Sequence, residues 1–455
     1  MLQEDQRTNL YERTVVPVDR SLPGFSDLLV PEKVCSLISG QLSESSIDIT
    51  GCRVLYLRYK PETNCIIAYM LQAVIDSRPE EFILYAKLYT VGDFENAVDK
   101  SNHHRWVSVP GAQSVLIFRE LKAIMYFYPN DCVMDGLRLT SDPKKIQRIL
   151  YENYDKFPEE EWRISDKRLK LTTVRYKPER RAVIRCDTRA ANRKTEKRRP
   201  LSVFLRFYGD DHGSRVFALQ EELFRLSRTH GVFAVPRPIA YLPQRRLLVM
   251  ETVHGKDLPE ELRGDRAVVA VTQTAIALAT LHSFVIPGLP ERSIDQYIAE
   301  TSATREMLKS ILPDISDTVE EIFEMLEKYD GDPVKRGTIH GDFYCGQILC
   351  DDQGVTILDF DRSSTGDAIM DVGNFTAYLR LMNMNGWLDK ASRLEQIFLS
   401  AYEEALGKKI PGRCLIFWAA FGLFQMSVRP FRSLENNWPE KTRDILEECR
   451  RILNS

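Results

Sequence analysis

The sequence predicts an α+β protein in which two sheet-forming units precede a mostly helical region. Alternating aliphatic and polar residues, bounded by turn formers, occur in two similar blocks within the first 257 residues. After residue 258 the apolar residues recur at helical spacing instead. Residues 338–375 then interrupt the helices with short strands that end in carboxylates. A chain of 455 residues is also long enough for two or three domains.

The two sheet blocks resemble each other closely enough to indicate an internal repeat. The stretch 55–71 matches the stretch 172–187, and both contain the pentapeptide Arg-Tyr-Lys-Pro-Glu, at 58–62 and at 175–179. The third and fourth expected strands of each block match in the same order and at similar spacing. We therefore interpret the blocks as a duplicated sheet unit.

Each unit is expected to form a strand, a turn containing proline, a second strand, a longer loop, a third strand and a later apolar strand. In the second unit, Val216, Leu219 and Leu223 indicate a helix that ends at Gly231. The stretch 142–162 is typical of a connecting helix and linker. These elements divide the chain into three predicted domains: 1–150, 151–257 and 258–455.

Composition excludes several classes of partner. The 62 basic and 65 acidic side chains nearly balance, so we expect neither nucleic acid nor membrane as a partner. The longest apolar run, 414–424, is shorter than the roughly 18 residues of a membrane span and predicts a buried helix. The start of the chain lacks an apolar leader, and the nine cysteines are odd in number and without a C-x-x-C pair. We expect a cytoplasmic protein, monomeric or homodimeric.

The carboxylates lie in "HGDFYCGQILC" and "VTILDFD", which the turn "DDQG" joins as a hairpin. This hairpin would bring Asp342, Gln347 and Asp359 to one end. Buried acids repel one another unless a cation neutralises them, and oxygen ligands favour Mg²⁺ over zinc. A magnesium ion with so few protein ligands takes the others from water and phosphate.

These motifs resemble the aminoglycoside phosphotransferase (APH) and choline kinase-like family of small-molecule kinases. The resemblance rests on His340-Gly341-Asp342, on the amide of Gln347 and on Leu358-Asp359-Phe360, and it extends over residues 165–430. It implies a bilobal protein-kinase-like fold, with a small sheet lobe and a helical lobe. The unit 1–150 would then be a cap that duplicates the sheet lobe.

The resemblance also implies roles. Asp342 would be the base that accepts the proton of the acceptor hydroxyl, and Asp359 and Gln347 would hold magnesium. The backbone around Glu251 and Val253 would receive the adenine of ATP, or the guanine of GTP. Three further side chains would support the site: His340, Asp361 and Asp371.

The sequence departs from the family pattern at the nucleotide site. Gln347 replaces the usual Asn, as in the maltokinase branch, and Arg206 stands where a phosphate-binding Lys is expected. Either Glu221 or Glu222 would pair with Arg206, and Lys87 of the first unit is a rival for its role. No glycine-rich loop is present; the charge would instead come from the turn residues Lys177, Arg180 or Arg181, or the turn would be a solvated hairpin.

The sequence therefore predicts an ATP- and magnesium-dependent phosphotransferase that phosphorylates a hydroxyl of a small polar metabolite, a sugar or an amino sugar. One alternative is an aminoglycoside antibiotic-modifying kinase. A second is a nucleotide-binding pseudokinase that acts as a scaffold.

Overall fold

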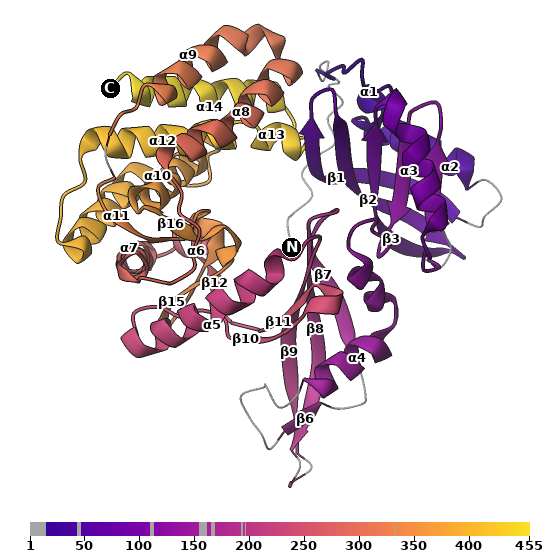
Figure 1. The fold of residues 1–455 in the computed structure, drawn as a ribbon, viewed down its shortest axis with the longest axis horizontal. Helices are drawn as coiled ribbons and strands as arrows, with labels where there is room; N and C mark the ends of the chain where they lie inside the picture. Colours follow the sequence, from indigo (N-terminus) through magenta and orange to yellow (C-terminus); the bar gives the residue numbers. More distant parts are fainter. Residues whose placement is uncertain are drawn as a thin grey trace.

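Two antiparallel sheets and a helical region meet around one centre. The computed structural model describes residues 15–42, 47–109, 113–153, 162–164, 169–192, 194–195, 197–331 and 333–455. In Figure 1 the first sheet, in indigo, and the helices of the C-terminal region, in orange and yellow, lie on opposite sides, and the second sheet, in magenta, lies below them.

The first sheet has the strand order β1-β2-β3-β5-β4. Its strands are β1 (Ile47–Lys60), β2 (Asn64–Ile75), β3 (Arg78–Tyr89), β4 (Val115–Phe118) and β5 (Ala123–Phe127). Its helices are α1 (Phe25–Leu28), α2 (Pro31–Gln41) and α3 (Val91–His103). Thr90 begins α3 by accepting the amide proton of Asp93.

The second sheet repeats this order as β7-β8-β9-β11-β10, with β6 as an additional strand on β8. Its elements are η1 (Asp135–Ser141), α4 (Pro143–Glu152), β6 (Trp162–Ile164), β7 (Lys170–Lys177), β8 (Arg181–Asn192), β9 (Arg198–Tyr208), α5 (His212–His230), β10 (Pro238–Leu242), η3 (Pro243–Arg245) and β11 (Leu247–Glu251). Helix α5 ends at Gly231, which adopts φ +68°, as the sequence predicted.

Each sheet holds its Tyr-Lys-Pro-Glu turn on an aspartate that precedes the sheet in the chain. Asp131 Oδ2 accepts hydrogen bonds from the hydroxyl of Tyr176 at 2.8 Å and from the amide of Glu179 at 2.9 Å. Asp19 accepts the same two bonds from the tyrosine and glutamate of the first turn, at 2.8 Å each. Both glutamates have positive φ, 59° and 62°. The two turns are thus fixed by the same device.

A glycine follows each aspartate by five residues, and close backbone contact requires it. A Cβ atom on Gly136 would lie 2.4 Å from the carbonyl oxygen of Arg245. A Cβ atom on Gly24 would lie 2.7 Å from that of Leu121. The segments 19–24 and 131–136 therefore pack on corresponding turns of their sheets, which supports the interpretation of the units as a repeat.

The two sheets share a hydrophobic core. It contains Ile66 and Tyr85 from the first sheet, Ile184 from the second, and Ile146 from α4. The predicted domain boundary at residue 150 falls within α4, whose apolar face is part of this shared core. Of the expected connecting segment, 154–161 lies outside the described residues. The domain boundaries at 150 and 257 stay predictions.

The C-terminal region is mostly helical. Its elements are β12 (Lys256–Asp257), α6 (Leu258–Glu261), α7 (Ala267–Ser283), α8 (Ile294–Ile311), η4 (Pro313–Ile315), α9 (Ser316–Glu327), β13 (Arg336–Ile339), η5 (Cys345–Gln347), β14 (Ile348–Asp351), β15 (Gly354–Ile357), η6 (Phe360–Arg362), β16 (Ser364–Asp367), α10 (Ile369–Met384), α11 (Ala391–Leu406), α12 (Gly412–Met426), α13 (Arg429–Arg432) and α14 (Trp438–Leu453). The predicted hairpin is present, with Asp351 opposite Gly354.

The apolar run predicted as a buried helix is α12. The helical stretch Gly412–Arg432 has the length and hydropathy of a membrane span, but 78% of its apolar window is buried inside the protein. This burial is what a core helix shows. All nine cysteines are free, as their number and spacing predicted.

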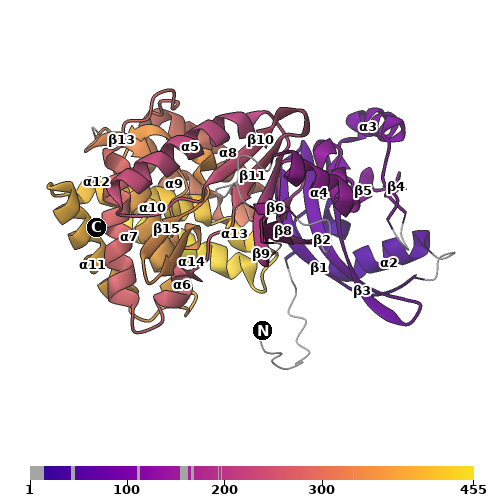
Figure 2. The same ribbon diagram turned by 90° about the horizontal axis from the view of Figure 1, so that it is seen from below.

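The first sheet also contacts the C-terminal region. Strand β1 lies beside α13 in both views (Figures 1 and 2). The hydroxyl of Tyr59 lies 2.8 Å from Ser310 Oγ of α8, and its ring meets Phe431 of α13 edge-on at 6.4 Å between ring centroids. The first unit therefore touches both the second sheet and the helices that follow it.

Candidate active site

The loop after β13 carries the predicted base and is fixed by a buried aspartate. Asp371, in the first turn of α10, accepts the backbone amide protons of His340 at 2.6 Å and Gly341 at 2.9 Å. His282 of α7 lies 3.1 Å from the same carboxylate and 2.7 Å from the hydroxyl of Tyr402. The structure thus brings Asp371 to the loop, where it was predicted to support it, and gives His282 a packing role.

Gly341 allows the sharp turn before Asp342. Its φ is +80°, and a Cβ atom there would lie 2.3 Å from the carbonyl oxygen of Arg362. The ring of His340 joins the two acidic loops: Nε2 donates to the carbonyl of Leu358 at 2.7 Å, and Nδ1 accepts the amide proton of Asp342 at 3.3 Å. His340 therefore fixes the spacing between the loop of Asp342 and the strand that leads to Asp359.

The carboxylate of Asp342 accepts no hydrogen bond within the described part of the chain. Burial raises its pKa, and the charge of Asp359 raises it further, while Arg362 and Lys177 act in the opposite direction. A desolvated carboxylate without a protein partner is suited to receive a hydroxyl proton from a ligand.

Asp359 is engaged by two arginines. Arg181, the first residue of β8, donates from Nη1 to Oδ1 at 2.6 Å and from Nη2 to Oδ2 at 2.9 Å. Arg206 of β9 lies 3.4 Å from Oδ1. Burial opposes the ionisation of Asp359, but the charges of Arg206 and Arg181 outweigh it and hold its pKa well below the usual range. Asp359 is therefore ionised, as a metal ligand must be.

Asp361 joins the same network. It pairs with Arg206 at 2.7 Å and also with Arg181, and it accepts a hydrogen bond from Tyr208 at 3.3 Å. His212, the first residue of α5, bonds to the backbone carbonyl of Asp361 at 2.7 Å. Sequence reasoning missed Tyr208 and His212, since neither belongs to a motif.

The predicted pairing of Arg206 with Glu221 or Glu222 is wrong. Glu221 is exposed, and Glu222 pairs with Arg225 on the surface. The buried face of α5 presents Gln220 instead, whose amide donates to the carbonyl of Pro236 at 2.9 Å. One residue is about 100° of helical rotation, which is enough to turn both glutamates away from the sheet.

The charged side chains of the turn between β7 and β8 have different neighbours. Arg181 reaches the acids, as described above. Lys177 faces Asp342 and Asp359, but desolvation, Arg175 and Arg181 lower its pKa to about 8. Arg180 is exposed, and its charge helps to lower the pKa of Arg432. Of the three candidates, Arg181 is the one in direct contact with the predicted metal ligand.

Lys87, the rival of Arg206, is occupied elsewhere. Its Nζ lies 2.9 Å from both carboxylate oxygens of Glu179, and Arg58 approaches the same group at 3.4 Å. Lys87 therefore binds the turn of the second unit rather than the acids of the C-terminal region.

The segment after β11 crosses the hairpin that leads to Asp359. Gly255 has φ +156°, and a Cβ there would lie 3.0 Å from the carbonyl oxygen of Cys350. The amide of Glu251 donates to Arg237, but that of Val253 makes no backbone hydrogen bond within the described residues. Thr252 Oγ1 is buried and likewise without a partner there. Free polar groups at this position suit the edge of a nucleotide base.

The oxygen atoms of Asp359 and its neighbour Gln347 are of the type that binds magnesium. Gln347 lies beside Asp359, with Nε2 3.4 Å from Oδ2. Carboxylate and amide oxygens are hard ligands that suit Mg²⁺. No cluster of three His, Cys, Asp or Glu side chains is arranged to hold a metal in the chain as described. Any ion at this place would therefore depend on the oxygens of its nucleotide and would share Asp359 with Arg181.

Comparison with known families gives one match. A sequence model described as "Phosphotransferase enzyme family" (APH) matches residues 186–403, which include every predicted catalytic and metal-binding residue. This stretch belongs to the phosphotransferase enzyme family. The match confirms the predicted family, the kinase-like α+β fold class and the enzyme class, an ATP-dependent small-molecule kinase. The first sheet lies outside the matched stretch.

Three solved structures to which this chain is similar have low sequence identity to it. A choline kinase from Cryptosporidium parvum Iowa II is 12% identical with a TM-score of 0.48, over 68% of this chain and 95% of that one. A macrolide 2'-phosphotransferase from Brachybacterium faecium is 14% identical at 0.44, over 67% and 98%. A choline/ethanolamine kinase family protein from Mesorhizobium loti is 15% identical at 0.42, over 63% and 88%. No curated protein matches the sequence.

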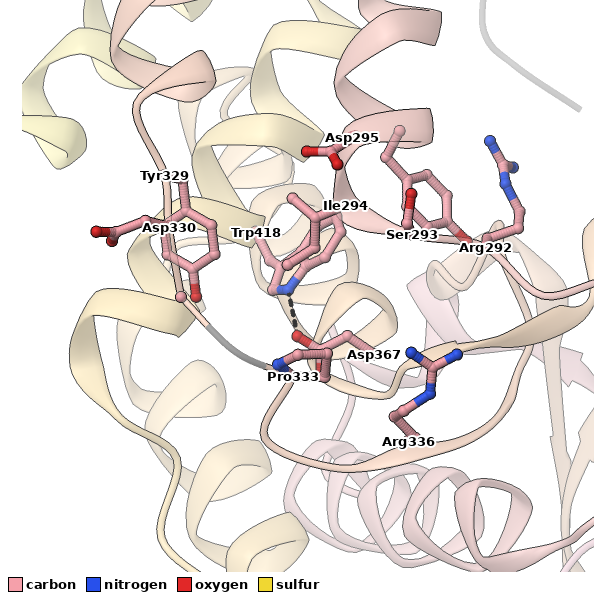
Figure 3. Close-up of a pocket in the computed structure, with 12 residues that line it drawn as sticks. Arg292, Ser293, Ile294, Asp295, Tyr329, Asp330, Pro333, Arg336, Asp367 and Trp418 are labelled. Carbon is pink, nitrogen blue, oxygen red and sulfur yellow. Dashed lines mark hydrogen bonds between the residues drawn. The ribbon is translucent and has the colours of Figure 1, made fainter.

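A separate cavity of about 310 Å³ opens among the helices of the phosphotransferase (Figure 3). Trp418 donates its indole proton to Asp367 at 2.8 Å at the back of this cavity, and Arg292 and Arg336 stand at one side. None of the predicted site residues lines it.

Proposed function

We propose that the protein transfers the γ-phosphoryl group of ATP, with Mg²⁺, to a hydroxyl of a small polar metabolite of the sugar class. One observation carries this proposal: Asp342, whose carboxylate accepts no hydrogen bond from the described residues, lies in the same electrostatic cluster as Asp359, which two arginines hold ionised. A kinase needs both kinds of carboxylate, one free to take a proton and one held as an anion.

In this mechanism each residue acts at a stated atom. The acceptor oxygen forms a bond to the γ-phosphorus while the bond to the departing ADP oxygen breaks, and the hydroxyl proton goes to Asp342. Arg181 and Arg206 keep Asp359 ionised and place positive charge beside the transferring group. The backbone at Val253 and the hydroxyl of Thr252 would receive the base. When bound through Asp359 and Gln347, magnesium neutralises phosphate charge.

The test is magnesium-dependent release of ADP from ATP over a panel of sugars, amino sugars, aminoglycosides and choline-like alcohols. We expect Asp342→Asn and Asp359→Asn to lose transfer by about 10³-fold while remaining folded. Asp352→Asn is the matched control, because Asp352 is exposed in the hairpin turn and pairs only with Arg266 in the described structure. Full activity in both site variants would overturn the proposal.

The pseudokinase alternative makes the opposite prediction. A scaffold that only binds nucleotide has no use for a desolvated carboxylate at Asp342. Magnesium-dependent nucleotide binding that is equal in wild type and Asp342→Asn, with no transfer to any acceptor, would favour the scaffold.

A further inference from the structure

A cluster of arginines beside Asp342 has no role in the phosphoryl transfer described above. We call it the arginine cluster, and three parts of the chain contribute to it. Its members are Arg175 of β7, Arg180 of the β7–β8 turn, Arg362 of η6, and Arg429 and Arg432 of α13. These elements are far apart in sequence, which is why no sequence motif predicts the cluster.

The cluster is electrostatically connected. Arg432 is exposed to solvent. Desolvation lowers its pKa, as do the like charges of Arg180, Arg362 and Arg429, while Tyr56 of the first sheet acts in the other direction. Guanidinium groups that gather in this way repel one another.

The cluster flanks the catalytic loop. The guanidinium carbon of Arg429 lies 5.8 Å from the ring centroid of Tyr344 and 5.2 Å from that of Tyr378. Tyr344 follows Asp342 by two residues, and its ring is 4.9 Å from that of Tyr378. The charge of Arg362 acts on Asp342 itself. The cluster therefore lies beside the loop that carries Asp342.

Ion pairs among the described residues leave most of the positive charge of the cluster without a partner. Within the described ranges, Arg175, Arg180, Arg429 and Arg432 form no ion pair, and Arg362 has one weak partner, Glu300 at 3.9 Å. Arg181 and Arg206 nearby are, in contrast, fully paired with Asp359 and Asp361. The pairing of the nucleotide-side arginines and the lack of it in the cluster indicate two different functions.

Four of the five members of the cluster lie outside the family match, since Arg175 and Arg180 precede residue 186. Arg429 and Arg432 follow residue 403, where the matched stretch ends. Helix α13, which carries both arginines, is packed against β1 of the first unit. Most of the positive surface is thus built by residues beyond the matched stretch.

We propose that the arginine cluster binds an anionic group of the acceptor, a phosphate or a carboxylate, so that the substrate is an acidic sugar or polyol. Guanidinium groups bind both anions in bidentate fashion, and the aromatic pair under Arg429 gives a sugar ring an apolar surface to rest on. A cationic amino sugar or aminoglycoside would be repelled. This inference rests on the proposed function, since it names the acceptor of the same site.

The first test uses four acceptors that share one ring: glucose, glucosamine, glucuronate and glucose 6-phosphate. In magnesium-dependent ADP release we expect at least one acidic sugar to exceed glucose and glucosamine in kcat/KM by about tenfold. The two acids distinguish carboxylate from phosphate recognition. Equal or better transfer to glucosamine would overturn the proposal.

Variants locate the effect. Arg429→Gln and Arg432→Gln should each raise the KM for the acidic sugar by about tenfold while the KM for ATP stays within about twofold. Arg432→Lys, which keeps the charge, should retain part of the affinity. Arg393→Gln is the matched control, because it makes the same change of charge on the exposed side of α11. An ATP KM that rises together with the acceptor KM would assign the cluster to the nucleotide and contradict the proposal.

A direct binding measurement makes the inference independent of turnover. Calorimetric titration of inorganic sulfate into the complex with magnesium and AMP-PNP should show binding in wild type and Arg393→Gln, and a loss of it in Arg432→Gln. If sulfate binds wild type no better than Arg432→Gln, the anion site does not exist. If sulfate behaves as expected but no acceptor supports ADP release, the anion site stands and the proposed phosphotransfer fails.

Discussion

The two sheet units have the same framework and use it for different contacts. Strand order, the anchored Tyr-Lys-Pro-Glu turn and the glycine contact are common to both. They differ at two positions that face the next part of the chain. Asn64 begins β2 where Arg181 begins β8, and Lys87 stands in β3 opposite Ile66 as Arg206 stands in β9 opposite Val183.

These two positions decide what each unit binds. In the second unit Arg181 and Arg206 bind the acids at Asp359 and Asp361. In the first unit Lys87 binds Glu179, in the turn of the second unit. The first unit thus holds the turn of the second much as the second holds the acidic loop. The same sheet framework thus carries different contacts, which are set by the residues at the start of one strand and in the middle of the next.

The largest expected difference follows from the first of these positions. Arg181→Ala should lower kcat/KM by about 100-fold or more, because Asp359 loses its bidentate partner in a desolvated place. Asn64→Ala, the corresponding change in the first unit, should leave activity within about twofold. Steady-state kinetics with circular dichroism as a folding control measures both. Equal losses would show that the two positions are not functionally different.

The anchoring aspartates should separate stability from activity. Asp131→Ala leaves the buried hydroxyl of Tyr176 and a backbone amide without an acceptor, and should lower the free energy of unfolding by about 3 kcal/mol. Asp19→Ala leaves the amide of Glu62 without an acceptor, while the hydroxyl of Tyr59 keeps Ser310 as a partner, so the loss should be about 2 kcal/mol. Only Asp131→Ala should also reduce transfer, since its turn carries Arg181. Urea unfolding and kinetics on the two variants give the comparison, and an equal loss of activity would contradict it.

The ion pair between the units should have a smaller effect. The carboxylate of Glu179 is 8% exposed, and Lys87 and Arg58 both contact it. Glu179→Gln should therefore cost about 2 kcal/mol of stability, because two partly buried cations lose their anion. Glu62→Gln, at the exposed matching position, should change the free energy of unfolding by less than about 0.5 kcal/mol. Thermal unfolding at fixed ionic strength tests the pair.

The smallest predicted effect is an uptake of protons when ATP binds. The pKa of Lys177 is lowered to about 8, so in the free protein Lys177 is partly neutral above that pH. Phosphates favour the charged form, and ATP binding at pH 8.5 should therefore take up a fraction of a proton. Stability should rise between about pH 8 and 10.5, where the unfolded chain binds the proton that the folded one has released.

Calorimetry in buffers of different ionisation enthalpy measures this uptake. Lys177→Arg should abolish it, since arginine stays charged throughout. Lys60→Arg, in the exposed turn of the first unit, should leave it unchanged. Uptake that persists in Lys177→Arg would show that another group titrates.

Local sequence signals predicted much of this site. His340, Asp342, Gln347 and Asp359 lie within twenty residues of one another, and a hairpin brings such residues together whatever surrounds them. The repeat was recognisable because its turn needs a fixed pentapeptide. Gly231 was correct as a helix end because a positive φ favours glycine.

The contacts that could not be predicted from the sequence join residues that are far apart in the chain. The partner of Arg206 was sought in α5, but the side chain that meets it, Asp361, comes from a loop about 150 residues later. The anchor Asp131 is more than forty residues from the turn that it holds. Arg432 joins its cluster only because α13 packs beside the catalytic loop. Neither periodicity nor closeness in sequence indicates any of these contacts.

The double attachment of the first unit has a mechanical consequence. Its Lys87 pairs with Glu179 of the second sheet. Its Tyr59 contacts α8 and α13, which follow the segment that contains Val253. It therefore connects the second sheet to the helices of the C-terminal region. We expect any movement that separates the second sheet from these helices to break contacts at both ends of this connection together.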